Sequence, residues 1–137
     1  MIASPHSILL DSEALALIAA DAASAQAWTA VALRTDSVLY ASAATLAEVT
    51  DGSGRDALIR RACAFVRIVP VVADIGFQAG RLRAAATTSR RKPRDLTVGS
   101  IVAATALALP SPTVVVTSDP TDLDLLLSGT PVKVLRT

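Results

Sequence analysis

Apolar residues along this chain fall into short continuous runs and longer segments with a helical period. Each short run has the length of one buried strand and is rich in Val, Ile and Leu. The longer segments repeat apolar residues three or four positions apart, as amphipathic helices do. The predicted strands are Ser7–Leu10, Val38–Ala41, a short strand within Val66–Val72, Thr113–Thr117 and Val132–Leu135. The predicted helices are Glu13–Ala23, Gln26–Arg34, Ala43–Val49, Leu58–Val66, Asp74–Ala86, Val98–Leu109 and Pro120–Leu127.

The predicted elements follow one another in the order β-α-α-β-α-α-β-α-α-β-α-β. Strands separated by helices pair in parallel, because each helix returns the chain to the same end of the sheet. We therefore predict an α/β fold with three layers, in which helices cover both faces of a five-stranded parallel sheet. A length of 137 residues and a hydrophobic content of 52% fit a single domain spanning 1–137.

The composition excludes some classes of site and of location. Cysteine and histidine occur once each, which excludes a zinc site of ordinary composition. The apolar stretch from Ile8 to Ala20 is interrupted by Asp11 and Glu13, so we predict neither a signal peptide nor a membrane span. We expect a cytoplasmic protein with no membrane partner.

Basic residues concentrate in one predicted loop, although the formal net charge is only +1. The loop carries Arg90, Arg91, Lys92 and Arg94 around a proline. Such a run can bind RNA phosphates, which gives affinity without sequence preference. The alternative is a solvated loop with no ligand.

Acidic residues follow several of the predicted strands. Asp11 directly follows the first strand, and Glu48 lies in the helix after the second. Asp119 comes two residues after the fourth strand, and Asp122 lies three residues further on, on the same side of a helix. Ligands of open parallel sheets bind beyond the carboxyl ends of the strands. We therefore predict that these four carboxylates gather at one edge of the sheet.

Clustered carboxylates repel one another, and a bound divalent cation removes that cost. Mg2+ and Mn2+ prefer oxygen ligands, and such an ion can activate water for attack on a phosphodiester. Each acid also has a simpler interpretation. Asp11 and Asp119 are good helix N-caps, Asp122 suits the positive end of a helix dipole, and Glu48 can be a surface residue.

The same residues resemble the motifs of PIN domains. Ile8 to Leu15 is similar to the hydrophobic-Asp start of these domains, and Leu46 to Val49 resembles their second acidic motif. Ile101 to Leu107 looks like the helix after their third acid, and Val115 to Leu123 closely resembles their final motif. The closest group is that of the VapC-like toxins of bacterial toxin–antitoxin pairs.

The resemblance implies a PIN-like fold, Mg2+ or Mn2+, RNA cleavage, a homodimer and a protein antitoxin. By analogy, Asp11 and Asp119 would hold the metal directly, Glu48 would complete its shell or orient the water, and Asp122 matches a further acidic position. One position departs from the pattern, because Gly99 stands where an Asp is expected. Asp95, one helical turn earlier, would reach the metal through water or serve only as an N-cap. Glu13 would replace the missing carboxylate or remain a solvated residue of the first turn.

Two hypotheses follow from these residues. The first is a metal-dependent endoribonuclease that acts as a toxin, and the four acids at Asp11, Glu48, Asp119 and Asp122 favour it. The second is a degenerate PIN domain that binds RNA or a protein partner without cutting, and Gly99 favours it. Trp28 can stack on a base, but a place in the core or in a groove for the antitoxin suits it better.

Overall fold

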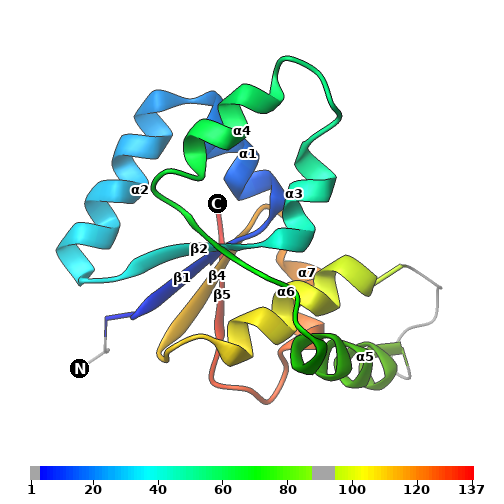
Figure 1. Ribbon diagram of the computed structural model, residues 1–137. Helices are drawn as coiled ribbons and strands as arrows, with labels where there is room; N and C mark the ends of the chain where they lie inside the picture. Colours follow the sequence, from blue (N-terminus) through cyan, green and yellow to red (C-terminus); the bar gives the residue numbers. More distant parts are fainter. Residues whose placement is uncertain (1–3, 88–94) are drawn as a thin grey trace.

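The computed structural model describes residues 4–87 and 95–137 of the chain (Figure 1). Its strands form one sheet in the order β3-β2-β1-β4-β5, and every pair of neighbours is parallel. The strands are β1 (Ser7–Leu10), β2 (Val38–Ser42), β3 (Arg67–Val69), β4 (Thr113–Thr117) and β5 (Lys133–Arg136). The predicted α/β class with a five-stranded parallel sheet is confirmed.

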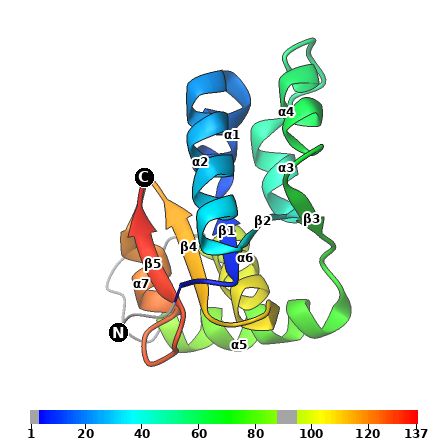
Figure 2. The same ribbon diagram turned by 90° about the vertical axis from the view of Figure 1, so that its left-hand side faces the viewer.

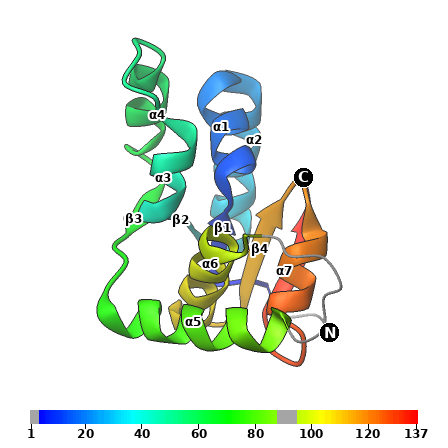
Figure 3. The same cartoon turned by 90° about the vertical axis from the view of Figure 1, so that its right-hand side faces the viewer.

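Helices cover both faces of this sheet (Figures 2 and 3). The helices are α1 (Ser12–Ala20), α2 (Ala22–Thr35), α3 (Ala43–Val49), α4 (Asp56–Ala62), α5 (Ala73–Thr87), α6 (Thr97–Ala108) and α7 (Pro120–Leu126). In the part of the chain that the structure describes, the order of helices and strands is the predicted one.

The central strand β1 separates two apolar cores, because its side chains alternate between the faces of the sheet. Ile8 and Leu10 pack with residues of α1, α2 and α4, while Leu9 packs with residues of α6 and α7. Helix α5 forms a further contact on the outside of α6 through Ile75 and Ala79. All four residues of β1 are buried, as expected for the middle strand of a doubly covered sheet.

Several predicted helix boundaries were wrong by a few residues, and α4 ends at Ala62 instead of Val66. The predicted helix Glu13–Ala23 ends at Ala20, because the carboxylate of Asp21 accepts a hydrogen bond from the backbone N–H of Ala23 and caps α2 instead. The short strand predicted within Val66–Val72 is confirmed, and it consists of the three residues of β3. Pro70 follows β3 directly and has no N–H to donate to a neighbouring strand.

The direction of α6 decides which of its ends lies near the acidic residues. The hydroxyl of Ser7, at the start of β1, donates to the carbonyl of Pro110 just after α6, over 2.6 Å. The carboxyl end of α6 therefore lies at the amino ends of the strands. Its amino end lies at the opposite edge, because a helix of 12 residues is about 18 Å long, close to the length of a strand of five residues.

Among the described helices, none is both long and apolar enough to cross a membrane alone. Helices α1 and α2 reach that length only as a pair, and the pair is bent by 116° at Asp21.

Candidate functional site

Asp11 lies where β1 ends and α1 begins. Its carboxylate accepts a hydrogen bond from the backbone N–H of Ala14 over 2.9 Å, so it is the N-cap of α1. Its own backbone N–H donates to the carbonyl of Val116 over 3.0 Å. This bond continues the pairing of β1 with β4 by one residue, and it fixes Asp11 beside the carboxyl end of β4.

Asp119 and Asp122 begin the helix after β4. Asp119 is the N-cap of α7, and its carboxylate accepts from the backbone N–H of Thr121 over 3.3 Å. The backbone N–H of Asp119 donates to the hydroxyl of Thr117 over 3.1 Å, which holds the turn between strand and helix. Asp122 lies in the first turn of α7 and is half-buried, with its Oδ1 atom shielded from solvent.

Glu13 joins the ends of β1 and β4 through its side chain. Its carboxylate accepts a hydrogen bond from the hydroxyl of Ser118, the residue before Asp119. Glu13 is exposed, but it is not merely a solvated residue of the first turn. The sequence contained no direct signal for this bond, since its partners are 105 positions apart. The parallel pairing of β1 with β4, which brings both strand ends to one edge, was the available clue.

Glu48 lies in different surroundings. It is the sixth of seven residues in α3 and is exposed. It lines a cavity of about 370 Å³ between α1, α3 and α4, together with Ala16, Asp51 and Arg55. The structure thus places Glu48 toward the far end of its helix, away from the end of β2 where the helix begins.

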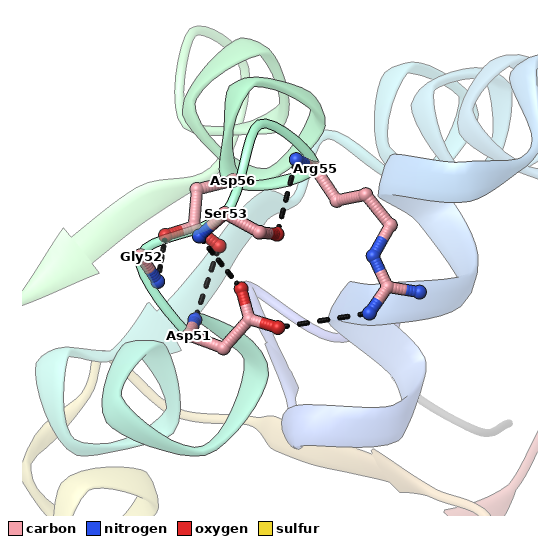
Figure 4. Close-up of polar contacts among 5 residues, drawn as sticks. All are labelled: Asp51, Gly52, Ser53, Arg55 and Asp56. Atoms are coloured by element: carbon pink, nitrogen blue, oxygen red, sulfur yellow. Dashed lines mark hydrogen bonds and ion pairs between the residues drawn. The ribbon is translucent and has the colours of Figure 1, made fainter.

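The loop between α3 and α4 orders the acids beside this cavity (Figure 4). The carboxylate of Asp51 accepts from the backbone N–H of Ser53 over 2.9 Å and forms an ion pair with Arg55 at 3.6 Å. The bonds from Ser53 hold the pKa of Asp51 below its ordinary value, and Arg55 contributes a smaller effect. The carboxylate of Asp56 accepts from the backbone N–H groups of Asp51 and Gly52. These acids stabilise a turn.

Asp95 and Gly99 lie at the start of α6. The carboxylate of Asp95 accepts from the backbone N–H of Thr97 over 2.9 Å, and the Thr97 hydroxyl accepts from Arg83 over 2.9 Å. The hydroxyl and backbone N–H of Thr97, together with the charge of Arg83, hold the pKa of Asp95 below its ordinary value. Asp95 is exposed and accepts from the first N–H of α6, although the N-cap position itself is held by Leu96 and not by Asp95 as the capping alternative predicted. Gly99 is the third residue of α6 and is half-buried against Leu126.

The structure brings together the carboxyl ends of β1 and β4. Asp11 and Glu13 follow β1, Asp119 follows β4, and Asp122 lies one turn after Asp119. No three acidic, histidine or cysteine side chains within residues 4–87 and 95–137 form a group that could hold a metal ion. The described residues therefore do not fit a metal held by protein ligands alone. Gly99 offers no carboxylate, and Glu48 lines the cavity between α1, α3 and α4.

Two further predictions concern Trp28 and the basic run. Trp28 is half-buried and packs against the core that contains Ile8 and Leu10, as predicted. It also lines a largely apolar cleft of about 370 Å³ between α2 and the face of β4 and β5, beside Val114 and Leu135. The basic residues Arg90, Arg91, Lys92 and Arg94 lie outside the described residues.

Comparison with solved structures places this arrangement among known folds. No family model matches the sequence, and no curated protein matches it. The chain is similar to VapBC2 from Rickettsia felis, whose structure was solved bound to a DNA fragment from its promoter. The TM-score is 0.74 at 12% sequence identity, and the match covers 96% of this chain and 98% of that chain. This chain has a PIN-like fold.

Other solved structures share this PIN-like fold. FitAcB from Neisseria gonorrhoeae gives a TM-score of 0.65 at 20% identity, and the match covers 93% of this chain and 96% of that one. VapBC-5 from Mycobacterium tuberculosis, a member of the VapBC family of toxin–antitoxin systems, gives 0.62 at 23% identity over 97% and 100% of the two chains. At these identities the likeness establishes the fold.

Proposed function

We propose that this protein is the toxin component of a toxin–antitoxin pair and acts as an endoribonuclease. The observation that carries the proposal is the placement of Asp11 and Asp119 on adjacent strand ends, joined by the bond from Asp11 to Val116. Asp122 adds a third carboxylate in the first turn of α7. The carboxyl edge of a parallel sheet is where open α/β folds bind their ligands. The PIN-like fold shared with VapBC and FitAB complexes supports a protein antitoxin as partner.

Mg2+ or Mn2+ remains part of this proposal, with Asp11 and Asp119 as the residues that would hold it. Because the described residues contain no three-ligand group, phosphate oxygens of RNA and water would have to supply the other ligands. Mg2+ is often bound in this way, by one or two carboxylates together with substrate phosphates. A bound divalent cation activates water and stabilises the leaving oxygen of a phosphodiester. Glu48 and Asp95 would act only at longer range.

An RNA cleavage assay with Mn2+ tests the proposal on three proteins. Asp11→Asn keeps a good N-cap but removes the charge, so we expect it to lose cleavage while the fold is retained. Asp21→Asn is the matched control, because Asp21 caps α2 with the same kind of bond and lies away from the strand ends. Equal activity in the parent and Asp11→Asn would contradict the role of Asp11.

A second candidate function is a PIN-like domain that binds RNA or a protein partner without cutting. Gly99 and the lack of a three-ligand group among the described residues favour it. Gly99→Asp separates the two candidates, since a Cβ atom at position 99 would meet only Leu126, at 3.5 Å, an ordinary contact. Absence of cleavage in the parent and its appearance in Gly99→Asp would overturn the first candidate and support the second.

The remaining partners can be tested separately. A short neighbouring reading frame that encodes a DNA-binding antitoxin, whose co-expression relieves toxicity, is the expected genetic context. A homodimer also belongs to the proposal, and light scattering of the purified protein measures it.

A further inference from the structure

Arg136 is the last residue of β5, at the edge of the sheet that carries Asp11 and Asp119. Strand β5 runs parallel to β4, and Arg136 is in register with Thr117. The backbone N–H of Thr137 donates to the carbonyl of Thr117 over 2.9 Å, so the pairing continues past Arg136. The backbone of Arg136 is therefore fixed next to the segment that leads into Asp119.

The face of the sheet on which Arg136 lies follows from the alternation of β5. Val134 packs with Val115 and Leu123 on the side of α6 and α7, while Leu135 lines the cleft on the opposite side. Arg136 lies two residues after Val134, so it shares the face of Val134 and of its register partner Thr117. The hydroxyl of Thr117 contacts the backbone of Asp119 on that face. Arg136 is exposed, and its side chain leaves the sheet on the face that carries α7.

Arg83 provides a second cation near this edge. It lies on α5 and is exposed, and its guanidinium donates to the hydroxyl of Thr97 at the first turn of α6. The amino end of α6 lies at the carboxyl ends of the strands, because its other end is joined to Ser7 through Pro110. Within residues 4–87 and 95–137, the ion pair found within 4 Å joins Arg55 to Asp51, and the charge of Arg83 acts on Asp95 from a longer distance.

Carboxylates at the strand ends repel a polyanion, so a strand of RNA approaches them only if cations lie close by. Guanidinium groups bind phosphate through two parallel hydrogen bonds, which fixes position as well as charge. We propose that Arg83 and Arg136 each bind a backbone phosphate of an RNA strand that lies across the carboxyl ends of β1 and β4. This inference rests on the proposed function for the identity of the polyanion, but it concerns binding and does not require cleavage.

The test is fluorescence anisotropy with a labelled single-stranded RNA in EDTA, where metal-dependent cleavage is stopped. We expect Arg136→Ala and Arg83→Ala each to weaken binding about fivefold to tenfold near 0.1 M salt, as the loss of one charge-assisted phosphate contact would. In each variant, the fall of the logarithm of the association constant with the logarithm of the salt concentration should also become less steep by about 0.7, the value for one phosphate of a single strand. Weaker RNA binding in both variants supports the proposal even where the two losses of affinity differ in size.

Arg34→Ala is the matched control, since Arg34 is an exposed cation in the last turn of α2, at the amino ends of the strands. It removes the same charge and should change binding less than twofold. Thermal unfolding of each variant checks that the fold is retained. Binding that is unchanged in Arg136→Ala and Arg83→Ala, or reduced equally in Arg34→Ala, would overturn the inference. So would a parent protein that binds DNA of the same sequence but not RNA.

The binding experiment and the cleavage experiment test the two proposals independently of each other. A parent that binds RNA through Arg83 and Arg136 but never cuts it refutes the endoribonuclease and leaves this inference intact. A parent that cuts RNA with unchanged affinity in both variants does the reverse.

Discussion

Replacing Gly99 by alanine tests whether position 99, where the PIN motif would place an acid, can accept a side chain. Gly99 is the third residue of α6, and a Cβ atom there would lie 3.5 Å from Cδ1 of Leu126, within ordinary van der Waals contact. Glycine inside a helix costs about 0.5–1 kcal/mol relative to alanine, mainly through backbone entropy. The added methyl group would be half-buried and contributes about 0.4 kcal/mol, half of the value for a fully buried carbon.

The expected stabilisation by Gly99→Ala is therefore about 1 kcal/mol. For a chain of 137 residues, this corresponds to a rise in Tm of about 3–4 °C, because the unfolding entropy is about 2.1 cal/mol/K per residue. Gly99→Asp should gain less, since aspartate is a poorer helix former, although its charge interacts favourably with the amino end of α6. Urea unfolding followed by circular dichroism measures both changes.

Destabilisation of both variants by more than about 1 kcal/mol would refute this reasoning, since it would mean that α6 and α7 cannot separate enough for any side chain. Helix packing would then exclude a carboxylate at position 99. Stabilisation by alanine and near-neutrality of aspartate would mean that the site lacks a carboxylate that the fold can accommodate. In that case Gly99→Asp is a fair test of activity.

Three further predictions concern stability. Asp119→Ala removes the N-cap of α7 and should lower the free energy of unfolding by about 1 kcal/mol in urea titrations, whereas Asp119→Ser should restore most of it. Leu15→Ala opens a cavity in the core against α1 and should cost about 2–5 kcal/mol, far more than Leu33→Ala at an exposed position of α2. The pKa of Asp95 is lowered in the folded protein, so its contribution to stability is present above about pH 4 and is lost as the pH falls through the lower folded value. The Tm difference between the parent and Asp95→Asn should accordingly vanish in acid, and a difference that grows toward low pH would contradict this account.

The sequence predicted the order of the elements because apolar residues are spaced differently in strands and in helices. Buried strands such as β4 are continuous runs of apolar residues, and the helices between them repeat every three or four residues. The direction of the strands then followed from the helical connections alone. For the same reason the amino-acid sequence was enough to predict that Asp11 and Asp119 lie at one edge of the sheet.

Other features depend on tertiary contacts that no local pattern encodes. The bond between Ser118 and Glu13 exists only because β1 pairs with β4, so neither segment indicates it alone. Glu48 follows its strand closely in sequence, but it lies at the far end of α3 and lines a cavity beside α1. Its position in the sixth place of α3 and on the wall of this cavity could not be predicted from the acidic motif alone.

The cleft between α2 and the face of β4 and β5 contains an intrinsic fluorescent probe. Trp28 is the single tryptophan of the chain, and it is half-buried on the wall of that cleft. Its emission reports the polarity around one place in the molecule. An apolar segment of any partner that enters the cleft would displace water from the indole and shift the emission to shorter wavelength. Titration of a binding partner can therefore be followed at this face of the sheet without a label, and a partner that binds only at the carboxyl edge would leave the spectrum unchanged.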